Sequence, residues 1–362
     1  MVLNSADLAE VAAGGETPVV AGTPRTKGRS IFAGLRSPKI LVGFAVVLLF
    51  VGIGIFGPLI YTTDPSALTT AILQPPSAAH LLGTTQTGQD VLAQLIDGTR
   101  TSLVVGFSAA ALATALALIV GLSAGYLGGV GDELLSALAN IFLVLPALPL
   151  VIVLAGYLPS KGSLTIAVVI SITGWAWGAR VLRAQTLSFR RRDFVEAARV
   201  AGEGPLRIIF AEILPNEGAI VASIFLGTVI FAVLTQAGLA FLGLSNVSLW
   251  SWGTMLYWAQ NDQALQEGAW WWFVPPGLCL ALLGTGLSLM NFGIDEFINP
   301  RLRAAGVGTK KAAVAARLDG ATRAKQGSPQ PRSTASAAPR YTPVQRAQPD
   351  RPAAQQGQAT AD

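Results

Sequence analysis

The stretch RRDFVEAARVAGEGPLRIIFAEILPN occupies residues 191–216 and lies between two apolar runs, each long enough to cross a lipid bilayer. It carries four arginines and four acidic residues. A charged side chain at the centre of a bilayer costs about 2.5–3.5 kcal/mol on insertion scales, so this stretch must lie outside the hydrocarbon. The sequence therefore predicts an all-α membrane protein with a structured element on one face, where a soluble partner can bind it.

The composition points to the same class of protein. Of the 362 residues, 52% are hydrophobic and only 12% are charged, whereas soluble domains carry about 25% charged residues. The chain has one cysteine, Cys279, and one histidine, His80. A metal site of the His/Cys type needs three or four such ligands, so we expect no site of that kind.

Apolar runs predict six transmembrane helices. A run of about 22 residues rises roughly 33 Å as a helix, which is enough to span a bilayer. The run around Trp175 and Trp177 is the weakest, and without it the two termini would lie on opposite sides. The predicted spans are residues 40–61, 101–127, 133–157, 163–182, 219–243 and 272–294.

The positions of lysine and arginine predict the orientation, because cytoplasmic loops are enriched in these residues. With six spans, both termini share a side with the loop that contains residues 191–216. Outside the C-terminal tail, fourteen Lys and Arg residues fall on this side and two, Arg100 and Lys161, fall on the other. We therefore expect the termini and residues 191–216 to be cytoplasmic.

These spans divide the chain into three regions. Residues 1–35 form a polar cytoplasmic segment without the apolar core of a signal peptide, so we expect the first span to be uncleaved. Residues 36–304 form the transmembrane domain. Residues 305–362 are basic and rich in Ala, Pro and Gln, with too few large apolar side chains to offset the entropy of ordering. We expect this tail to be disordered and either solvated or attached to anionic lipid.

The outer loops have a different composition. Residues 244–271 contain no lysine or arginine and five tryptophans, and Trp272 follows directly. Indole rings favour the level of the lipid headgroups, so these residues are interpreted either as an interfacial belt or as a docking surface for an outside partner. Two interpretations also stand for Gly121 and Gly125, which can pack inside the bundle or against a second membrane subunit. Three polar residues of the loop before the second span are weaker candidates for contact with an outside partner: Asp90, Gln94 and Asp97.

Within the charged stretch, the segment from Asp193 to Ala201 has the composition of a short helix. Glu196 lies near its start, where a negative charge suits the helix dipole. Gly202 follows and can adopt the left-handed conformation that ends helices. The next residues turn the chain, and Pro215 marks the approach to the fifth span. The small alanines of this helix would let the groove of a partner come close.

The pattern EAARVAG followed, nine residues later, by Glu212-Ile213-Leu214-Pro215 resembles the EAA loop of ABC importer permeases. Four further blocks resemble the C-type permease of dipeptide, oligopeptide and nickel importers. They are HLLGTTQTGQDVLAQLIDGTRTSL (80–103), AGYLGGVGDELL (124–135), SWGTML (251–256) and NPRLR (299–303). The chain departs from the family at Gln89, where arginine is common, and at Glu212, where an aliphatic residue is common. The residues that match the EAA motif are Glu196, Ala197, Ala198, Gly202, Leu214 and Pro215.

The resemblance implies a type I importer permease fold with six transmembrane helices in a bacterial cytoplasmic (inner) membrane. It also implies partners: a second homologous permease, one or two cytoplasmic ABC ATPases, an extracytoplasmic solute-binding protein and membrane lipid, but no nucleic acid. The EAA helix would fit a cleft on the ATPase, whose closure on ATP moves the permease between inward-open and outward-open states. ATP and magnesium would belong to the ATPase, so this chain is expected to be neither an enzyme nor the holder of a cofactor.

Two features of the residues agree with this expectation. The chain has no G-x-x-x-x-G-K-[ST] loop to cradle phosphate, and the cores of the predicted spans hold none of the ionisable groups that ion-coupled carriers use. Peptide is the expected solute, followed by nickel or another small polar nutrient. The alternatives from other classes are a self-sufficient secondary transporter or channel, and a membrane scaffold without transport activity.

Overall fold

The computed structural model describes residues 38–158 and 162–298, and every named element within these ranges is a helix. Five helical segments are long and apolar enough to cross a membrane, and the bent pair α5 and α6 would make a sixth. The predicted segments 1–35 and 305–362 lie outside the described residues. The elements are α3 (Pro38–Ile60), α4 (Val91–Leu127), α5 (Gly129–Val144), α6 (Ala147–Tyr157), α7 (Ser163–Phe189), α8 (Asp193–Val200), α9 (Pro205–Arg207), the π-helix η1 (Ile208–Ile213), α10 (Leu214–Phe241), α11 (Trp252–Asn261) and α12 (Trp270–Ile298).

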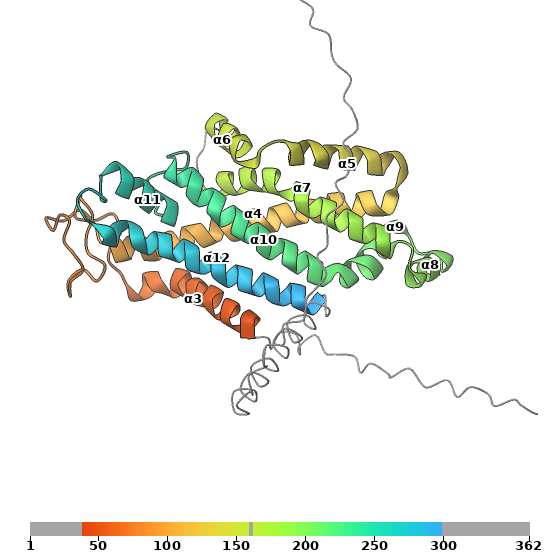
Figure 1. Cartoon of the computed structure of the whole chain (residues 1–362), viewed down its shortest axis with the longest axis horizontal. Coiled ribbons are helices and arrows are strands. Elements are labelled where there is room, and N and C mark those ends of the chain that lie inside the picture. Colours follow the sequence, from red (N-terminus) through yellow and green to blue (C-terminus); the bar gives the residue numbers. More distant parts are fainter. Residues whose placement is uncertain (1–37, 159–161, 299–362) are drawn as a thin grey trace, which may run out of the picture. The chain divides into compact units, whose positions relative to one another are not determined.

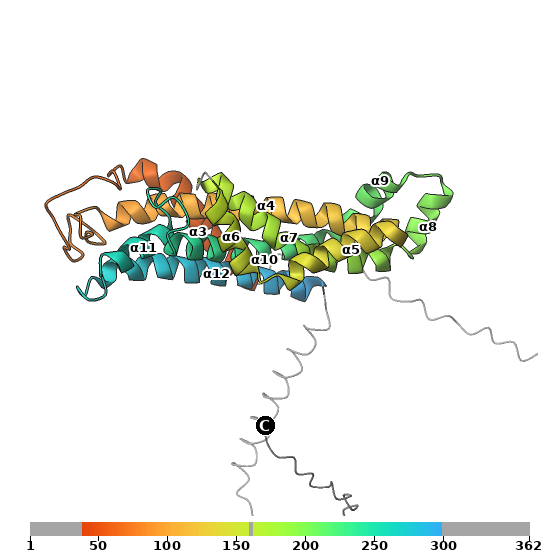
Figure 2. The ribbon, with the colours of Figure 1, turned by 90° about the horizontal axis from the view of Figure 1, so that it is seen from above.

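The centre of the bundle is the contact between α4 and α7, which run side by side (Figures 1 and 2). Small residues make this close approach feasible. A Cβ atom added to Gly121 would lie 2.6 Å from the carbonyl oxygen of Ala179, and one added to Gly125 would lie 2.6 Å from Cβ of Thr186. The two glycines therefore pack inside this chain, as the first of the two interpretations predicts. α10 packs against α4, α7 and α12, and α3 packs against α4 and α12.

The expected third span, residues 133–157, is divided into two helices. α5 and α6 meet at an angle of 90°. Leu145 is extended, with φ −69° and ψ 128°, and Pro146 is the N-cap of α6. A residue that precedes proline is pushed out of the helical region because the proline ring clashes with it. The bend therefore follows from Pro146, although the residues on both sides of it are apolar.

Two other helices begin earlier than the apolar runs suggest. α4 begins at Val91, ten residues before the predicted boundary, because the carboxylate of Asp90 accepts a hydrogen bond from the backbone N–H of Ala93 (2.9 Å) and so caps the helix. The helical chain of the fifth span begins at Pro205. It passes through Pro215, where the sequence predicted only the approach to a span.

The end of the bundle opposite α8 is formed by residues 61–90 and 242–269, which include α11, and we call this region the loop cap (Figure 1). Trp252 and Trp272 at this end are almost completely buried, and Trp250, Trp258 and Trp271 are partly buried against an apolar cluster around Met255. Most of these tryptophans thus form the core of the loop cap, in place of the predicted interfacial belt or docking surface. Of the six, Trp270 stays exposed, at 55%.

Candidate functional site

The candidate site is α8, a helix of eight residues at the end of the bundle away from the loop cap (Figure 1). Its first turn carries Asp193 and Glu196, whose negative charge suits the positive end of the helix dipole. Its end is a Schellman motif, in which Gly202 N–H donates to the carbonyl of Arg199 (3.0 Å) and Glu203 N–H donates to that of Ala198 (3.1 Å). Gly202 has φ +82°, as the sequence predicted, and a side chain there would be strained.

One side of α8 is attached to the bundle by an apolar contact that we call the anchor cluster: Val195, Leu122, Ile208, Ile209 and Ile213. Val195 is the buried residue of α8, and it packs with side chains of α4 and η1. Burying a valine side chain contributes roughly 1.5–3 kcal/mol. α8 is therefore held by its underside to α4 and to the helix that continues into α10.

Contacts at the edges of α8 fix its orientation further. The guanidinium of Arg199 lies 5.4 Å from the centre of the Tyr126 ring, a cation–π contact with the end of α4. The rings of Phe189 and Phe194 lie 6.4 Å apart, which links the end of α7 to the start of α8. These contacts leave the opposite side of the helix uncovered.

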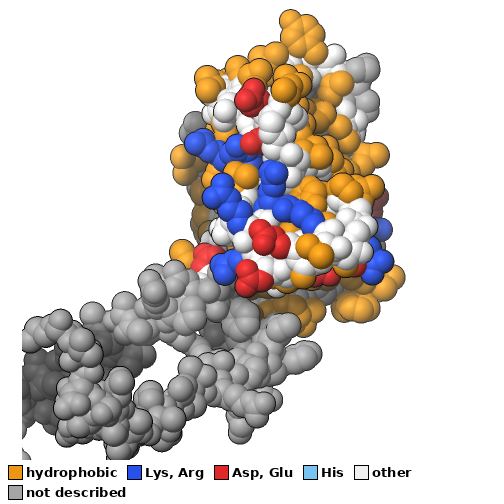
Figure 3. Space-filling view, turned by 90° about the vertical axis from the view of Figure 1, so that its right-hand side faces the viewer, with side chains coloured by type: hydrophobic (Ala, Val, Ile, Leu, Met, Phe, Trp, Pro, Cys, Tyr) orange, Lys and Arg blue, Asp and Glu red, His pale blue; other side chains and the backbone are white. Residues whose placement is uncertain are grey.

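The uncovered side of α8 presents small residues with charges around them. Glu196, Ala197 and Gly202 are exposed, and Val200 is 90% exposed. A Cβ atom added to Gly202 would meet nothing within 4 Å. Arginines and carboxylates gather on the face of the molecule at this end (Figure 3). A partner can therefore bring its surface close to the backbone of α8 and meet a negative charge, from Glu196, beside an apolar side chain.

The six predicted site residues fall into two groups. Glu196, Ala197, Ala198 and Gly202 lie in α8 and the turn after it, whereas Leu214 and Pro215 lie at the start of α10. Leu214 packs against the anchor cluster. Ala198 packs against the same cluster from α8, so the motif combines three exposed residues, Glu196, Ala197 and Gly202, with two that attach this region to the bundle, Ala198 and Leu214.

Pro215 accounts for the π-helix that precedes it. Proline lacks an N–H, and within an α-helix its ring clashes with the carbonyl four residues earlier. The wider π turn of residues 208–213 lies directly before it, and Leu214 N–H bonds to the carbonyl of Ile209, five residues back. Short π segments are frequent at functional sites, and this one supplies three residues of the anchor cluster.

Two features near α8 escaped the sequence analysis. Glu217 is completely buried and accepts a hydrogen bond from the hydroxyl of Thr186 (3.0 Å). The guanidinium of Arg183 donates to the carboxylate of Asp132 (2.7 Å), which links α7 to α5. Glu217 lies two residues before the predicted fifth span, so its position gave no signal of burial.

The loop cap and the first two turns of α4 hold the residues that were predicted to contact an outside partner. Asp90 and Gln94 are buried, and Nε2 of Gln94 donates to the carbonyl of Pro65 (3.3 Å) and to Oε1 of Gln89 (2.9 Å). The carboxylate of Asp90 accepts from the hydroxyl of Tyr61 (3.0 Å) and lies 2.9 Å from Nδ1 of His80. In this structure neither Asp90 nor Gln94 can reach a partner, and that interpretation is wrong because both are used to build the loop. Asp97 is partly exposed.

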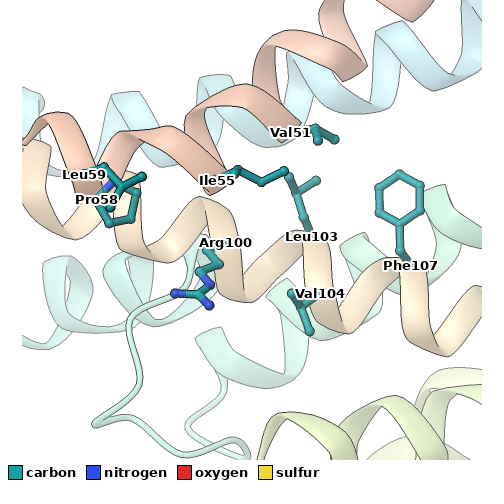
Figure 4. A pocket seen from close by; sticks show the side chains of 9 residues that line it. Val51, Ile55, Pro58, Leu59, Arg100, Leu103, Val104 and Phe107 are labelled. Atoms are coloured by element: carbon teal, nitrogen blue, oxygen red, sulfur yellow. The ribbon is translucent and has the colours of Figure 1, made fainter.

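Two larger hollows lie along the helices. One, of about 510 Å³, lies between α3 and α4, and Arg100 is its charged residue among apolar side chains such as Ile55, Leu103 and Phe107 (Figure 4). The other, of about 500 Å³, lies at the bend between α5 and α6 and is closed by α7 and α10, with Thr173, Trp177 and Thr228 in its lining. Among the residues described, no group of three or more His, Cys, Asp or Glu side chains comes together as a metal site.

Comparison with known proteins gives consistent matches over the helical domain. Residues 117–304 match the family described as "Binding-protein-dependent transport system inner membrane component". The chain is 35% identical over 275 residues to the oligopeptide transport system permease protein OppC of Bacillus subtilis, covering 74% of this chain and 88% of that protein. It is 35% identical to the dipeptide transport system permease protein DppC of Haemophilus influenzae, covering 73% of this chain and 90% of that protein. It is 34% identical to the di/tripeptide transport system permease protein DppC of Pseudomonas aeruginosa, covering 73% and 88%.

Proposed function

The chain belongs to the family of binding-protein-dependent transport system inner membrane components, and we propose that it is the transmembrane permease subunit of an ATP-driven peptide importer. The fold is that of a type I importer permease, with helical elements only among the residues described. The permeases to which it is similar are transport subunits, named for oligopeptides, dipeptides and di- and tripeptides. A single observation carries the proposal: a short exposed helix with the EAA pattern is mounted on the end of a membrane bundle.

The role of α8 follows from its two sides. Its exposed side, with Glu196, Ala197 and Gly202, fits a cleft on a cytoplasmic ABC ATPase that binds and hydrolyses ATP with magnesium. Its buried side, through Val195, contacts α4 and η1. Closure of the ATPase on ATP would therefore displace α8 and, through the anchor cluster, the helices to which it is attached. In this proposal α8 transmits the movement, and ATP hydrolysis by the partner supplies the energy.

The distribution of charge supports a cytoplasmic position for α8. Among the residues described, eight lysines and arginines lie at the α8 end of the helices and one, Arg100, lies toward the loop cap. Under the positive-inside rule the α8 end, where α3 begins and α12 ends, faces the cytoplasm. The loop cap then faces outward, toward a solute-binding protein. A second, homologous permease would complete the translocation pathway.

Reconstitution tests this proposal. Proteoliposomes would contain this chain with the second permease and the ATPase subunits, and the solute-binding protein with a radiolabelled dipeptide or oligopeptide would be added outside. We expect peptide uptake that requires internal ATP and stops when the ATPase subunit is omitted. Replacing the peptide with nickel tests the other solute of the family. Uptake by this chain alone under an ion gradient would overturn the proposal in favour of a secondary transporter.

A further inference from the structure

A buried polar pair lies where α8 is joined to the bundle. Two apolar clusters follow one another along α4, α7 and α10. The first is the anchor cluster under α8, and the second is a bundle cluster deeper in the helices that includes Ala117, Leu182 and Ile224. Between the two clusters, Thr186 of α7 faces Glu217 of α10. This pair is a polar contact between two apolar clusters.

The positions along each helix place the pair at the junction. On α7, Leu182 belongs to the bundle cluster, Thr186 follows one turn later, and Phe189 packs on the anchor cluster one turn after that. On α10, Ile213 just before the helix belongs to the anchor cluster, and Ile220 after Glu217 packs on the bundle cluster. Residues three and four apart share a helix face, so both helices present the same order of apolar, polar and apolar side chains to each other.

The contact itself is fully enclosed. Thr186 and Glu217 both have 0% relative exposure, and the Thr186 hydroxyl donates to Oε1 of Glu217 at 3.0 Å. Oε2 of Glu217 is buried without a hydrogen-bond partner among the described residues. On the other side of Thr186, the backbone of α4 at Gly125 leaves no room even for a methyl group. Three helices thus meet at one buried hydrogen bond.

A buried hydrogen bond of this kind specifies one arrangement of two helices. Apolar surfaces can slide past each other at small cost, whereas moving α10 along α7 would leave a buried hydroxyl and a buried carboxyl without partners. α7 leads into α8, and η1, continuous with α10, receives the chain after it. The pair therefore controls the relative position of the two helices between which α8 is suspended.

We propose that Thr186 and Glu217 form a positional lock between α7 and α10, so that a displacement of α8 is passed to both helices together. The expected effect of the lock on transport rests on the proposed coupling function of α8. The claim that the contact fixes the position of α7 relative to α10 concerns this chain alone. The two residues are positioning residues, since neither contacts solute or nucleotide.

The first experiment uses the full chain alone in lipid nanodiscs. Spin labels are placed at Ser188→Cys and Gly218→Cys, two exposed positions at the ends of α7 and α10, after Cys279→Ala, and the interspin distance distribution is measured by electron paramagnetic resonance. We expect Thr186→Val to broaden the distribution. Thr186→Ser keeps the hydroxyl and Glu217→Gln keeps an acceptor oxygen, so both should keep the width of the parent protein.

A double variant separates the lock from protein stability. Thr186→Val with Glu217→Leu removes both polar groups at once, which avoids an unpaired buried group and should preserve thermal stability. The distance distribution should still be broad, because the directional bond is gone. A distribution as narrow as that of the parent protein, in Thr186→Val or in the double variant, would overturn the lock.

The second experiment measures peptide molecules imported per ATP hydrolysed in the reconstituted transporter. We expect Thr186→Val to lower this ratio about fivefold, within the range of mutations that change coupling without touching a ligand, and Thr186→Ser to restore it. An unchanged ratio in Thr186→Val would show that the Thr186–Glu217 lock does not contribute to the coupling of ATP hydrolysis to transport. If the parent protein shows no ATP-dependent uptake, the proposed function fails, and the spin-label result still decides the lock.

Discussion

The loop cap and α8 occupy opposite ends of the same bundle and are built on opposite principles. In the loop cap, the polar side chains of Thr84 and Thr85 are completely buried, and tryptophans fill the spaces between loops. In α8, one side chain, Val195, is buried, while Glu196, Ala197, Arg199 and Val200 are exposed.

The hydrogen bonds show the same difference. The hydroxyl of Thr84 accepts from the N–H of Gln74 (2.9 Å) and its carbonyl accepts from the indole of Trp271 (3.2 Å), so one residue joins two segments of the loop cap and α12. At α8, the bonds of the Schellman motif stay within the helix and its own turn. The hydrogen bonds of the loop cap therefore join segments that are distant in the sequence, whereas those at the end of α8 are local.

The largest expected effect is in the loop cap. Trp252 is 0% exposed, its indole N–H donates to the hydroxyl of Thr99 (3.2 Å), and its ring packs edge-on against Phe50 with centres 5.3 Å apart. Trp252→Ala should lower the free energy of unfolding by about 3–5 kcal/mol, because it leaves a large cavity and removes the indole hydrogen bond to Thr99. Thermal unfolding in detergent measures this. Trp270→Ala, at the exposed tryptophan of the same end, is the control and should change stability by less than about 1 kcal/mol.

The next effect concerns α8 and should appear in transport. Gly202→Val places a β-branched side chain at φ +82°, which costs of order 1–3 kcal/mol locally and disrupts the end of the helix. We expect uptake in the reconstituted transporter to fall about tenfold or more while ATP hydrolysis continues and the protein still inserts. Gly204→Ala is the matched control, since Gly204 has φ −73° and open space around it. Normal uptake by Gly202→Val would show that α8 is not the coupling element.

A smaller effect is expected from the cap of α4. Asp90→Ala removes the acceptor for Ala93 N–H and leaves Tyr61 and His80 without their shared carboxylate. Loss of an N-cap and of a buried acceptor should cost about 1–2 kcal/mol of stability. Hydrogen exchange localised to residues 61–95 would check this, with exchange in α8 unchanged. Faster exchange in α8 as well would mean that the two ends are not independent.

The sequence was sufficient for the class of fold and for α8, because both depend on local signals. Long apolar runs predicted segments that overlap the observed long helices, and the small residues of α8 followed by Gly202 predicted a short helix that ends in a left-handed turn. The ends of the long helices were harder to predict, because hydropathy marks the residues that lie in the lipid and not the residues at which a helix begins or ends. α4 begins ten residues before its apolar run, because Asp90 caps it and Gln94 in the added segment is buried.

Three further features depend on contacts that one sequence does not display. Tryptophans such as Trp252 and Trp272 are typical of an interfacial belt, but here the loops cover and bury both side chains. Pro146 bends a run that is apolar on both sides. Glu217 is buried because α4, α7 and α10 converge on it, and residues so far apart in the chain give no local signal of that meeting.

The smallest expected effect would sharpen the contrast between the two ends most directly. Val200 is 90% exposed at the tip of α8, although valine is apolar, and an exposed apolar residue among small ones suits a surface that a partner covers. Val200→Asp should leave thermal stability unchanged and weaken ATPase binding about fivefold, since a charge would be desolvated on docking. Val130→Asp, 70% exposed on α5 near the same end, is the control and should bind as the parent protein does. Equal binding by both variants would place the ATPase contact elsewhere on this end, and α8 would then be a structural corner of the bundle.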